Sequence, residues 1–541
     1  MATNASLNSF ASLLAQATAA TGDGQGYAAG TWLGIAAGVL LLLVLGIAIW
    51  DVSQKKHAII HNFPVIGHFR YLLESIGPEI RQYIVAKNDE ERPFSRDQRR
   101  WVYASSKKEN NYFGFGTDND LEASANHLII KHSAFPITSP RRGEPGYDPN
   151  YAIPCTKILG ETRGRKKAFR PSSIINVSGM SFGSLSAPAI QAINRGCKIA
   201  DCMHNTGEGG VSSYHEEGGD LMWQLGTGYF GARDSQGRFD KQKFLDVVAS
   251  KPAVRAIEIK LSQGAKPGLG GMLPKSKITE EIAQTRGIQM GVDCASPSSH
   301  SAFSDIDSML DFVEDLAESS GLPVGIKSAV GEMQFWEQLV QAMSQGDRGV
   351  DFITIDGGEG GTGAAPLVFS DFVALPFKLA LSRVYRFFVE AGIHDKVVFV
   401  GSGKLGFPQQ SLLAMSLGCD LIHVAREPML AIGCIQAQAC HTGHCPTGVA
   451  TQKSWLMRGL EPTEKGNRLA NYITTLRKEI LQLCHACGVA HPAQLSTDQF
   501  DIIDESYGIR TATDCFKYQA SWSMPNADSQ RWISDWHKMQ A

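Results

Sequence analysis

Between residues 174 and 433, short apolar and β-branched runs that end in glycine-rich segments alternate with helical patterns. The runs are IINVSGMSFG, MHNTGEGG, AIEIKLSQGAK, MGVDCASP, PVGIKSAVG, FITIDGGEGGTGAAP, VVFVGSGKLG and LIHVAREP. Helical patterns such as SDIDSMLDFVEDLAESS and EMQFWEQLVQAMSQG separate the later runs. This alternation is typical of a parallel sheet covered by helices, and eight is the number of strands in a (β/α)8 barrel.

A doubly wound open sheet is the alternative fold. No G-x-G-x-x-G joins a strand to a helix in the manner of dinucleotide-binding sheets, so the barrel is preferred. We therefore expect an α/β protein with a TIM barrel, an N-terminal transmembrane helix and small N- and C-terminal extensions. The expected divisions are a tail (1–26), the transmembrane helix (27–50), an N-terminal extension (51–170), the barrel with a cysteine loop (171–450) and a helical extension (451–541).

The segment from Tyr27 to Trp50 has 24 residues and no charge. A helix of this length can cross a hydrocarbon core of about 30 Å, and a buried globular helix is the alternative. No Lys or Arg precedes the segment, which argues against a cleaved signal peptide. Lys55 and Lys56 follow it, so the positive-inside rule predicts a single-pass membrane protein whose catalytic domain is cytoplasmic.

The composition is that of an ordinary globular protein, with 43% hydrophobic and 19% charged residues. Its 51 basic and 54 acidic residues nearly cancel, so the charge balance gives no indication of nucleic acid binding. In a reducing compartment, the 11 cysteines are expected to be core residues, metal ligands or catalytic thiols rather than disulfides. The CHAC segment at 484–487 lies on the apolar stripe of a predicted helix, which favours packing over zinc.

Cys434, Cys440 and Cys445 follow the spacing C-x5-C-x4-C in a loop rich in Gly and Pro, where no helical face explains them. Three thiolates suit an iron–sulfur cluster that lacks one iron or has one open site. Zinc bound by these cysteines with His441 or His444 is the competing interpretation.

The loops after the seventh and eighth predicted strands read GSGKLG and AREP, and such loops commonly bind phosphate in barrels. Glycines that only form tight turns are the simpler explanation for any one loop. However, Lys260 lies in the otherwise apolar strand IEIK, and a buried ammonium needs an anion or an electron-rich ring beside it. Flavin mononucleotide (FMN) supplies both groups.

The motifs SGMSFGSLS, NTGEGG, EIKLSQGAKPGLGG, DGGEGGTGAAP and CHTGHCPTGVATQ occur in this order between about residues 90 and 500. Together they resemble the FMN-binding synthase domain of glutamate synthase, in its membrane-anchored, single-domain form. The resemblance implies a [3Fe–4S] cluster on Cys434, Cys440 and Cys445. It also implies that ammonia and 2-oxoglutarate give L-glutamate by hydride transfer from reduced FMN, with electrons relayed by the cluster.

The family's site residues carry over by position. The implied flavin contacts are the backbone of Ser181, Phe182 and Gly183, the side chains of Lys260 and Gln263, and the glycine loops at Gly357, Gly358, Gly401, Ser402 and Gly403. In the family, a lysine and an arginine that match Lys266 and Arg286 grip the carboxylates of 2-oxoglutarate. A glutamate that matches Glu208 lies near the reacting centre.

Three departures from the family pattern affect the expected chemistry. A glutaminase domain is absent, so ammonia must come from solution or from a partner, and a membrane helix stands in its place. No dinucleotide motif is present, which predicts ferredoxin or a separate NAD(P)H-dependent reductase as electron donor. Met272 replaces a glutamine that usually contacts the 2-oxo acid, so the identity of the substrate is left open.

Other classes of function remain as alternatives. One is a membrane-tethered FMN and iron–sulfur protein that only transfers electrons, or that acts on another 2-oxo or imino acid. A barrel retained as a non-catalytic binding subunit is another. A barrel of the inosine monophosphate dehydrogenase type is disfavoured because no loop cysteine is placed to attack a base.

Overall fold

The computed structural model describes residues 25–77, 91–112, 114–122, 124–504 and 508–540. The chain forms two compact units, residues 1–85 and residues 86–541. The described part of the first unit is helical, and its helices are α2 (Gln25–Ser53), α3 (Ala58–Asn62) and α4 (Gly67–Ser75). Helix α2 contains the predicted span, and from Gly30 to Ser53 it is apolar, long enough to cross a membrane and not buried within the protein.

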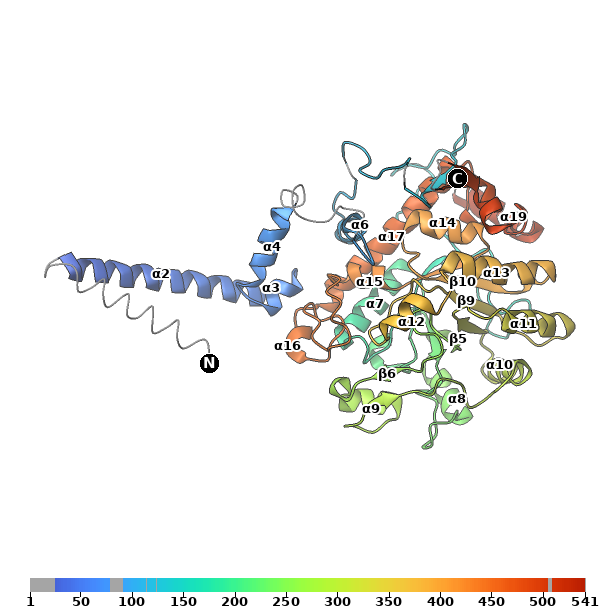
Figure 1. Cartoon of the computed structure of the whole chain (residues 1–541), viewed down its shortest axis with the longest axis horizontal. Helices are drawn as coiled ribbons and strands as arrows, with labels where there is room; N and C mark the ends of the chain where they lie inside the picture. Colours follow the sequence, from blue (N-terminus) through green and yellow to red (C-terminus); the bar gives the residue numbers. More distant parts are fainter. Residues whose placement is uncertain (1–24, 78–90, 113, 123, 505–507, 541) are drawn as a thin grey trace. The chain divides into compact units, whose positions relative to one another are not determined.

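The second unit is built around a closed barrel of eight parallel strands, as the hydrophobic pattern predicted (Figure 1). Around the barrel the strands follow the order β10, β11, β2, β3, β4, β5, β8, β9. Their bounds are β2 Ile175–Val177, β3 His204–Asn205, β4 Leu221–Leu225, β5 Val254–Lys260, β8 Val324–Ser328, β9 Phe352–Asp356, β10 Val398–Ser402 and β11 Leu421–Val424.

One predicted barrel strand is wrong. The run MGVDCASP supplies only β7 (Cys294–Ala295), which pairs antiparallel with β6 (Met272–Leu273) outside the barrel. The strand between β3 and β5 is instead β4, with the sequence LMWQL, and all five of its residues are buried. The stretch from Gly291 to Asp293 is exposed, whereas β4 is buried on both faces, as a barrel strand must be.

Helices surround the barrel: α10 packs against β8 and α13 against β9 and β10, and in Figure 1 α10, α11 and α13 lie to the right of β9 and β10. Their bounds are α6 Arg96–Lys107, α7 Ala187–Ala200, α8 Lys241–Ser250, α9 Glu280–Arg286, α10 Ile306–Ser320, α11 Gln334–Gln345, α12 Leu367–Phe372, α13 Phe377–Glu390, α14 Pro408–Ser416 and α15 Arg426–Ala431. The C-terminal part adds α16 Ser454–Met457, α17 Pro462–Ala486, α18 Ala512–Phe516 and α19 Ala527–Gln540. The helical patterns at 304–320 and 332–346 are therefore confirmed as α10 and α11.

Helix α17 packs against α7 and buries the apolar stripe that contains the CHAC segment. A Cβ atom on Gly196 of α7 would lie 2.7 Å from Leu469 of α17, so the two helices approach each other too closely for any larger residue there. Cys484 and Cys487 lie in the core beneath this contact. A separate three-stranded sheet joins β1 (Leu128–Ile130), β12 (Phe500–Ile503) and β13 (Ile509–Thr511).

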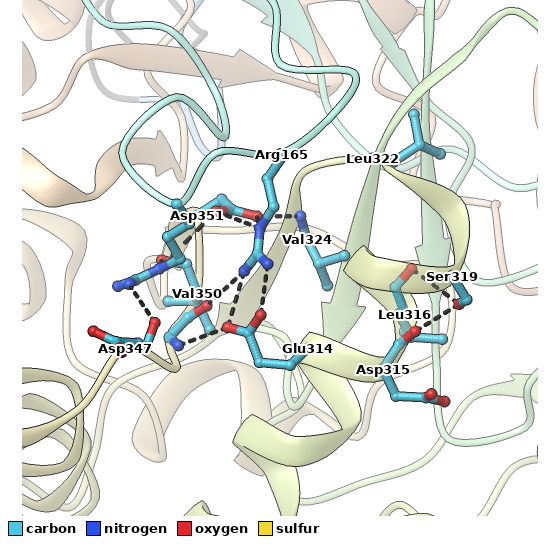
Figure 2. A network of polar contacts seen from close by, with 12 residues as sticks. Arg165, Glu314, Asp315, Leu316, Ser319, Leu322, Val324, Asp347, Val350 and Asp351 are labelled. Carbon is cyan, nitrogen blue, oxygen red and sulfur yellow. Dashed lines mark hydrogen bonds and ion pairs between the residues drawn. The ribbon is translucent and has the colours of Figure 1, made fainter.

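A network of charged groups lies at the amino-terminal ends of β8 and β9 (Figure 2). Arg165 donates to both carboxylate oxygens of Glu314 on α10, at 2.5 and 3.0 Å, and its Nε donates to Asp351 at 3.0 Å. Asp351 precedes β9 and also accepts the backbone N–H of Val324 at the start of β8, at 2.7 Å. The network ties a segment outside the barrel to β8 and β9. Sites in barrels of this kind lie at the opposite, carboxyl-terminal face.

Candidate active site

Four charged side chains gather at the carboxyl-terminal mouth of the barrel. Glu208 follows β3, Lys260 ends β5, Lys266 lies in the next loop, and Arg286 is the last residue of α9. Lys260 Nζ is 3.1 Å from Glu208 Oε1 and also donates to Gln263 Oε1 at 3.1 Å. Lys260, Lys266 and Arg286 are all buried. The structure thus brings together the three predicted catalytic residues and two of the predicted flavin contacts.

The three cations control the charge state of Glu208. Burial alone would raise its pKa, but the charges of Lys260 and Lys266, together with the hydrogen bond from Lys260, outweigh burial and lower the pKa to about 2. Glu208 is therefore ionised at neutral pH. Burial in turn lowers the pKa of Lys266 and of Arg286, and the charge of Glu208 opposes both shifts.

Arg286 connects this charged group to the predicted flavin loop after β2. Its Nη2 donates to the carbonyl oxygen of Phe182 at 3.1 Å and lies 3.5 Å from Ser181 Oγ. Gly183 has a φ of 103°, and a Cβ there would lie 3.2 Å from Nη2, so glycine is required on both grounds. The Nε of Arg286 is buried without a hydrogen-bond partner.

Sequence reasoning missed the residues that hold Lys260 in place. His300 Nε2 lies 2.9 Å from the carbonyl oxygen of Lys260, and its Nδ1 lies 2.9 Å from the hydroxyl of Tyr229. Burial lowers the pKa of His300, which keeps this contact uncharged. Both residues are far from Lys260 in the sequence. The only local signal for His300 is that a polar residue stands in the loop after β7.

A second missed pair supports the loop that carries Gln263 and Lys266. Asp356, at the end of β9, accepts the backbone N–H of Gly264 at 2.9 Å and lies 3.6 Å from Lys327 Nζ on β8. Burial would lower the pKa of Lys327, but the charges of Asp356 and of Glu258 outweigh burial and raise it. Lys327 is the register partner of Lys260, so two buried lysines stand on neighbouring strands at the same height.

Two more cations lie after β10 and β11, where the loops GSGKLG and AREP were expected to bind phosphate. Lys404 Nζ is 5.2 Å from the ring centre of Phe94, and Arg426 Cζ is 5.0 Å from the same ring. Burial lowers the pKa of Lys404, and the charge of Arg426 lowers it further, while Glu427 and Glu359 oppose the shift. The sequence indicated these loops but not the convergence of their cations.

The predicted glycine contacts pack against the protein itself. A Cβ on Gly403 would lie 3.3 Å from Gly357, and one on Gly358 would lie 2.9 Å from the carbonyl oxygen of Ala374. The space beside Gly401 is filled by Cys419, Leu405 and Phe377, so this glycine allows close packing behind β10. Ser402 is buried, and its backbone carbonyl accepts the N–H of Gly357 at 2.8 Å. Flavin contacts through these backbones stay a prediction.

The three loop cysteines interact electrostatically: beyond the effect of burial, Cys445 raises the pKa of Cys440, and both raise the pKa of Cys434. Burial raises the pKa of Cys434 to about 12, and the other two cysteines add to the rise. Lys277 reaches this loop from the segment after β6 and donates to the carbonyl oxygen of Cys440 at 2.6 Å. Within the described residues, no group of three or more His, Cys, Asp or Glu side chains is arranged to hold a metal ion.

The closed parallel barrel, with a buried cationic group and glycine loops at the carboxyl ends of its strands, defines a (β/α)8-barrel protein with a polar site at its mouth. Within that class the chain belongs to the glutamate synthase family, because the family described as the conserved region in glutamate synthase matches residues 156–490. The resemblance found in the motifs is thereby confirmed at the level of the family.

Two relatives show how far the similarity extends. The chain is 36% identical over 488 residues to the glutamate synthase large subunit-like protein YerD of Bacillus subtilis (strain 168), covering 85% of this chain and 92% of that protein. It is 32% identical over 316 residues to the archaeal glutamate synthase [NADPH] of Methanocaldococcus jannaschii, covering 58% of this chain and 59% of that protein. Among solved structures, a flavocytochrome b2 variant with sulfite bound has a TM-score of 0.43 at 14% identity, covering 84% of this chain and 92% of that chain.

Proposed function

We propose that the protein catalyses the reductive amination of 2-oxoglutarate with ammonia to L-glutamate, using FMN and electrons relayed by a [3Fe–4S] cluster. The observation that carries the proposal is the buried charge balance at the barrel mouth. Three cations, Lys260, Lys266 and Arg286, face one ionised carboxylate, Glu208. The excess of two positive charges matches the two carboxylates of a 2-oxo dicarboxylic acid, because unpaired buried charges are costly.

The residues have distinct tasks in this reaction. Lys266 and the unpartnered Nε of Arg286 bind the substrate carboxylates. Two protons move from the nitrogen to the 2-oxo oxygen, one as ammonia adds to the 2-oxo carbon and one as that oxygen leaves as water, and Glu208 relays each of them. Lys260 stabilises ionised Glu208 through their 3.1 Å contact. FMN, when bound, would supply the hydride for reduction of the resulting imine.

The mouth of the barrel fits FMN at two places. Lys404 and Arg426 repel each other across Phe94, and a phosphate between the loops after β10 and β11 would relieve that repulsion. Lys260 is the buried ammonium that can stabilise the negative charge of a reduced flavin ring. These two sites lie on opposite sides of the barrel: the first follows β10 and β11, and the second follows β5.

One buried cation, Lys277, supports the proposal of an anionic cluster at the cysteine loop. Lys277 is buried and donates to the carbonyl oxygens of Cys440 at 2.6 Å and of Ala450 at 3.4 Å, and it forms no ion pair with a carboxylate of the described residues. Burial lowers its pKa, and only the charges of Cys440 and Cys445 oppose that shift. A buried cation in this position favours the ionised thiolates of Cys440 and Cys445, the form in which cysteines bind iron.

The exposed helix α2 supports a membrane anchor, and Lys55 and Lys56 after it support a cytoplasmic location for the barrel unit. The electron donor we infer is ferredoxin or a separate NAD(P)H-dependent reductase, and free ammonia is the nitrogen source.

The test uses the purified, flavin-loaded full chain, reduced chemically without oxygen. Addition of 2-oxoglutarate with ammonium should reoxidise the flavin and yield glutamate, whereas 2-oxoglutarate with glutamine should not. The oxidised protein should also show the electron-spin signal of a three-iron cluster. Absence of reoxidation by any 2-oxo acid would leave an electron-transfer protein, and absence of bound flavin would reject the proposal as a whole.

Met272 bears on the identity of the acid. It lies on β6 and is 50% exposed, and it takes the place of a glutamine expected from the family. A lost hydrogen bond typically costs about 0.5–1.5 kcal/mol, or roughly a two- to tenfold rise in KM. Met272→Gln should therefore lower the KM for 2-oxoglutarate by that factor with kcat unchanged. An unchanged KM, together with faster turnover of another 2-oxo acid, would show that the substrate differs.

A further inference from the structure

The short helix α4, which follows the predicted span in the first unit, carries an apolar stripe that the described protein leaves uncovered. The stripe consists of Ile66, Phe69, Leu72, Leu73 and Ile76, with exposed fractions between 41% and 77%. Spacings of three and four residues place these side chains along one side of the helix. On the same helix Arg70 and Glu74 form an ion pair one turn apart, so the helix is amphipathic.

Helix α4 is held against the end of α2 by a buried carboxylate. Asp51 is fully buried, and its Oδ2 accepts the backbone N–H of Val65 at 2.8 Å. Its Oδ1 lies 2.8 Å from His68 Nε2, on the first turn of α4. These bonds fix the start of α4 relative to the last turns of α2, where Ile49 and Trp50 are highly exposed.

A close contact with α3 also fixes the position of α4. A Cβ on Gly67 would lie 3.0 Å from the Cα of Ile60 and 3.1 Å from the carbonyl oxygen of Ile59. The ring of Tyr71 packs edge-on against His57 at 5.3 Å. The side of α4 that faces α3 is thus used for packing within the unit, and the apolar stripe points elsewhere.

We infer that the stripe of α4 lies in the headgroup region of a phospholipid bilayer, so that this unit both spans the membrane and rests on its surface. The inference depends on the proposed span, because a crossing α2 places Trp50 and Asp51 at the membrane–water boundary. Asp51 then holds α4 at that same depth, where an amphipathic helix buries its apolar side between lipids. Lys55 and Lys56 are exposed beside it and match an anionic membrane surface.

The test places a photoreactive phenylalanine analogue at single positions of the full chain in vesicles of phosphatidylcholine and phosphatidylglycerol. The positions are Phe69 and Leu73 on the stripe, Glu74 as the polar control on the same helix, and Leu41 within the span. Irradiation should give lipid adducts at 69 and 73 with yields similar to those at 41 and at least fivefold above those at 74.

Adducts from 69 and 73 to protein, whether to a second copy or to another part of the chain, would overturn the inference, and so would lipid yields no higher than at 74. If 41 forms lipid adducts and the stripe does not, the span survives and the surface contact fails. If 41 forms none either, the proposed span itself is wrong. Asp51→Ala should lower the lipid yield at 69 and 73 several-fold while the yield at 41 stays the same. Equal yields would show that Asp51 does not orient α4.

Discussion

Arg286 links the predicted flavin loop to the proposed substrate site, because Nη2 donates to the carbonyl oxygen of Phe182 while the buried Nε has no hydrogen-bond partner. Removing one partner of a buried charge pair typically costs about 2–5 kcal/mol, so Arg286→Ala should lower kcat/KM for 2-oxoglutarate well over tenfold. Arg286→Lys should recover part of the loss. Initial rates of anaerobic flavin reoxidation measure the effect, and Lys275→Ala, at an exposed position nearby, should stay within twofold of the wild type. A normal kcat/KM in Arg286→Ala would remove Arg286 from the site.

Lys277 provides a test of whether the cysteine loop binds an iron–sulfur cluster. Its buried ammonium, bonded to the carbonyl oxygen of Cys440, should favour the reduced and more negative form of a cluster. Lys277→Gln should lower the cluster's reduction potential by about 59 mV, a tenfold change in the ratio of reduced to oxidised cluster for one electron. Potentiometric titration followed by electron spin resonance measures the shift. Lys277→Arg should restore the potential and Lys275→Gln should not change it, whereas an unaltered potential in Lys277→Gln would contradict the assignment.

At the scale of elements, the barrel depends on the network at its amino-terminal face. Arg165 ties α10 to the residue before β9, and the Arg165 and Asp351 side chains are almost completely buried. Arg165→Ala removes the cation bonded to Glu314 and leaves Asp351 only Arg163, at 4.0 Å, so it should lower the free energy of unfolding by about 3–5 kcal/mol. Arg348→Ala, which breaks exposed pairs with Asp307 and Asp311, should cost only about 0–1 kcal/mol. Urea unfolding with matched m values compares the two, and equal costs would contradict the structural role of the network.

For the whole molecule, the charge asymmetry around α2 predicts topology. A tag fused after the last residue should be protected from protease in spheroplasts and cleaved in inverted vesicles, because Lys55 and Lys56 retain the following chain in the cytoplasm. Replacing both lysines with Gln should make the orientation mixed. Cleavage of the wild-type tag in spheroplasts would place the barrel unit outside the cytoplasm.

The strand pattern predicted the barrel and every strand but one. MGVDCASP and LMWQL both resemble short strands bounded by turn residues, so local signals could not choose between them. The choice was made by pairing across the barrel, where Leu225 of β4 is in register with Ile259 of β5 and His204 of β3 with Leu221. Such contacts depend on the positions of several other strands, which no single segment encodes.

The sequence by itself determined what local periodicity and ordered motifs can carry: the alternation of strands and helices, the apolar span, the buried stripe of α17, the cysteine loop and membership of the glutamate synthase family. Only the tertiary structure decided which charges meet. Lys404 reaches Phe94 beside Arg426, and Lys277 reaches Cys440 across 163 positions of the chain. Electrostatic and hydrogen-bond energies act over a few ångströms in space, and distance along a sequence does not report that separation until the barrel has closed.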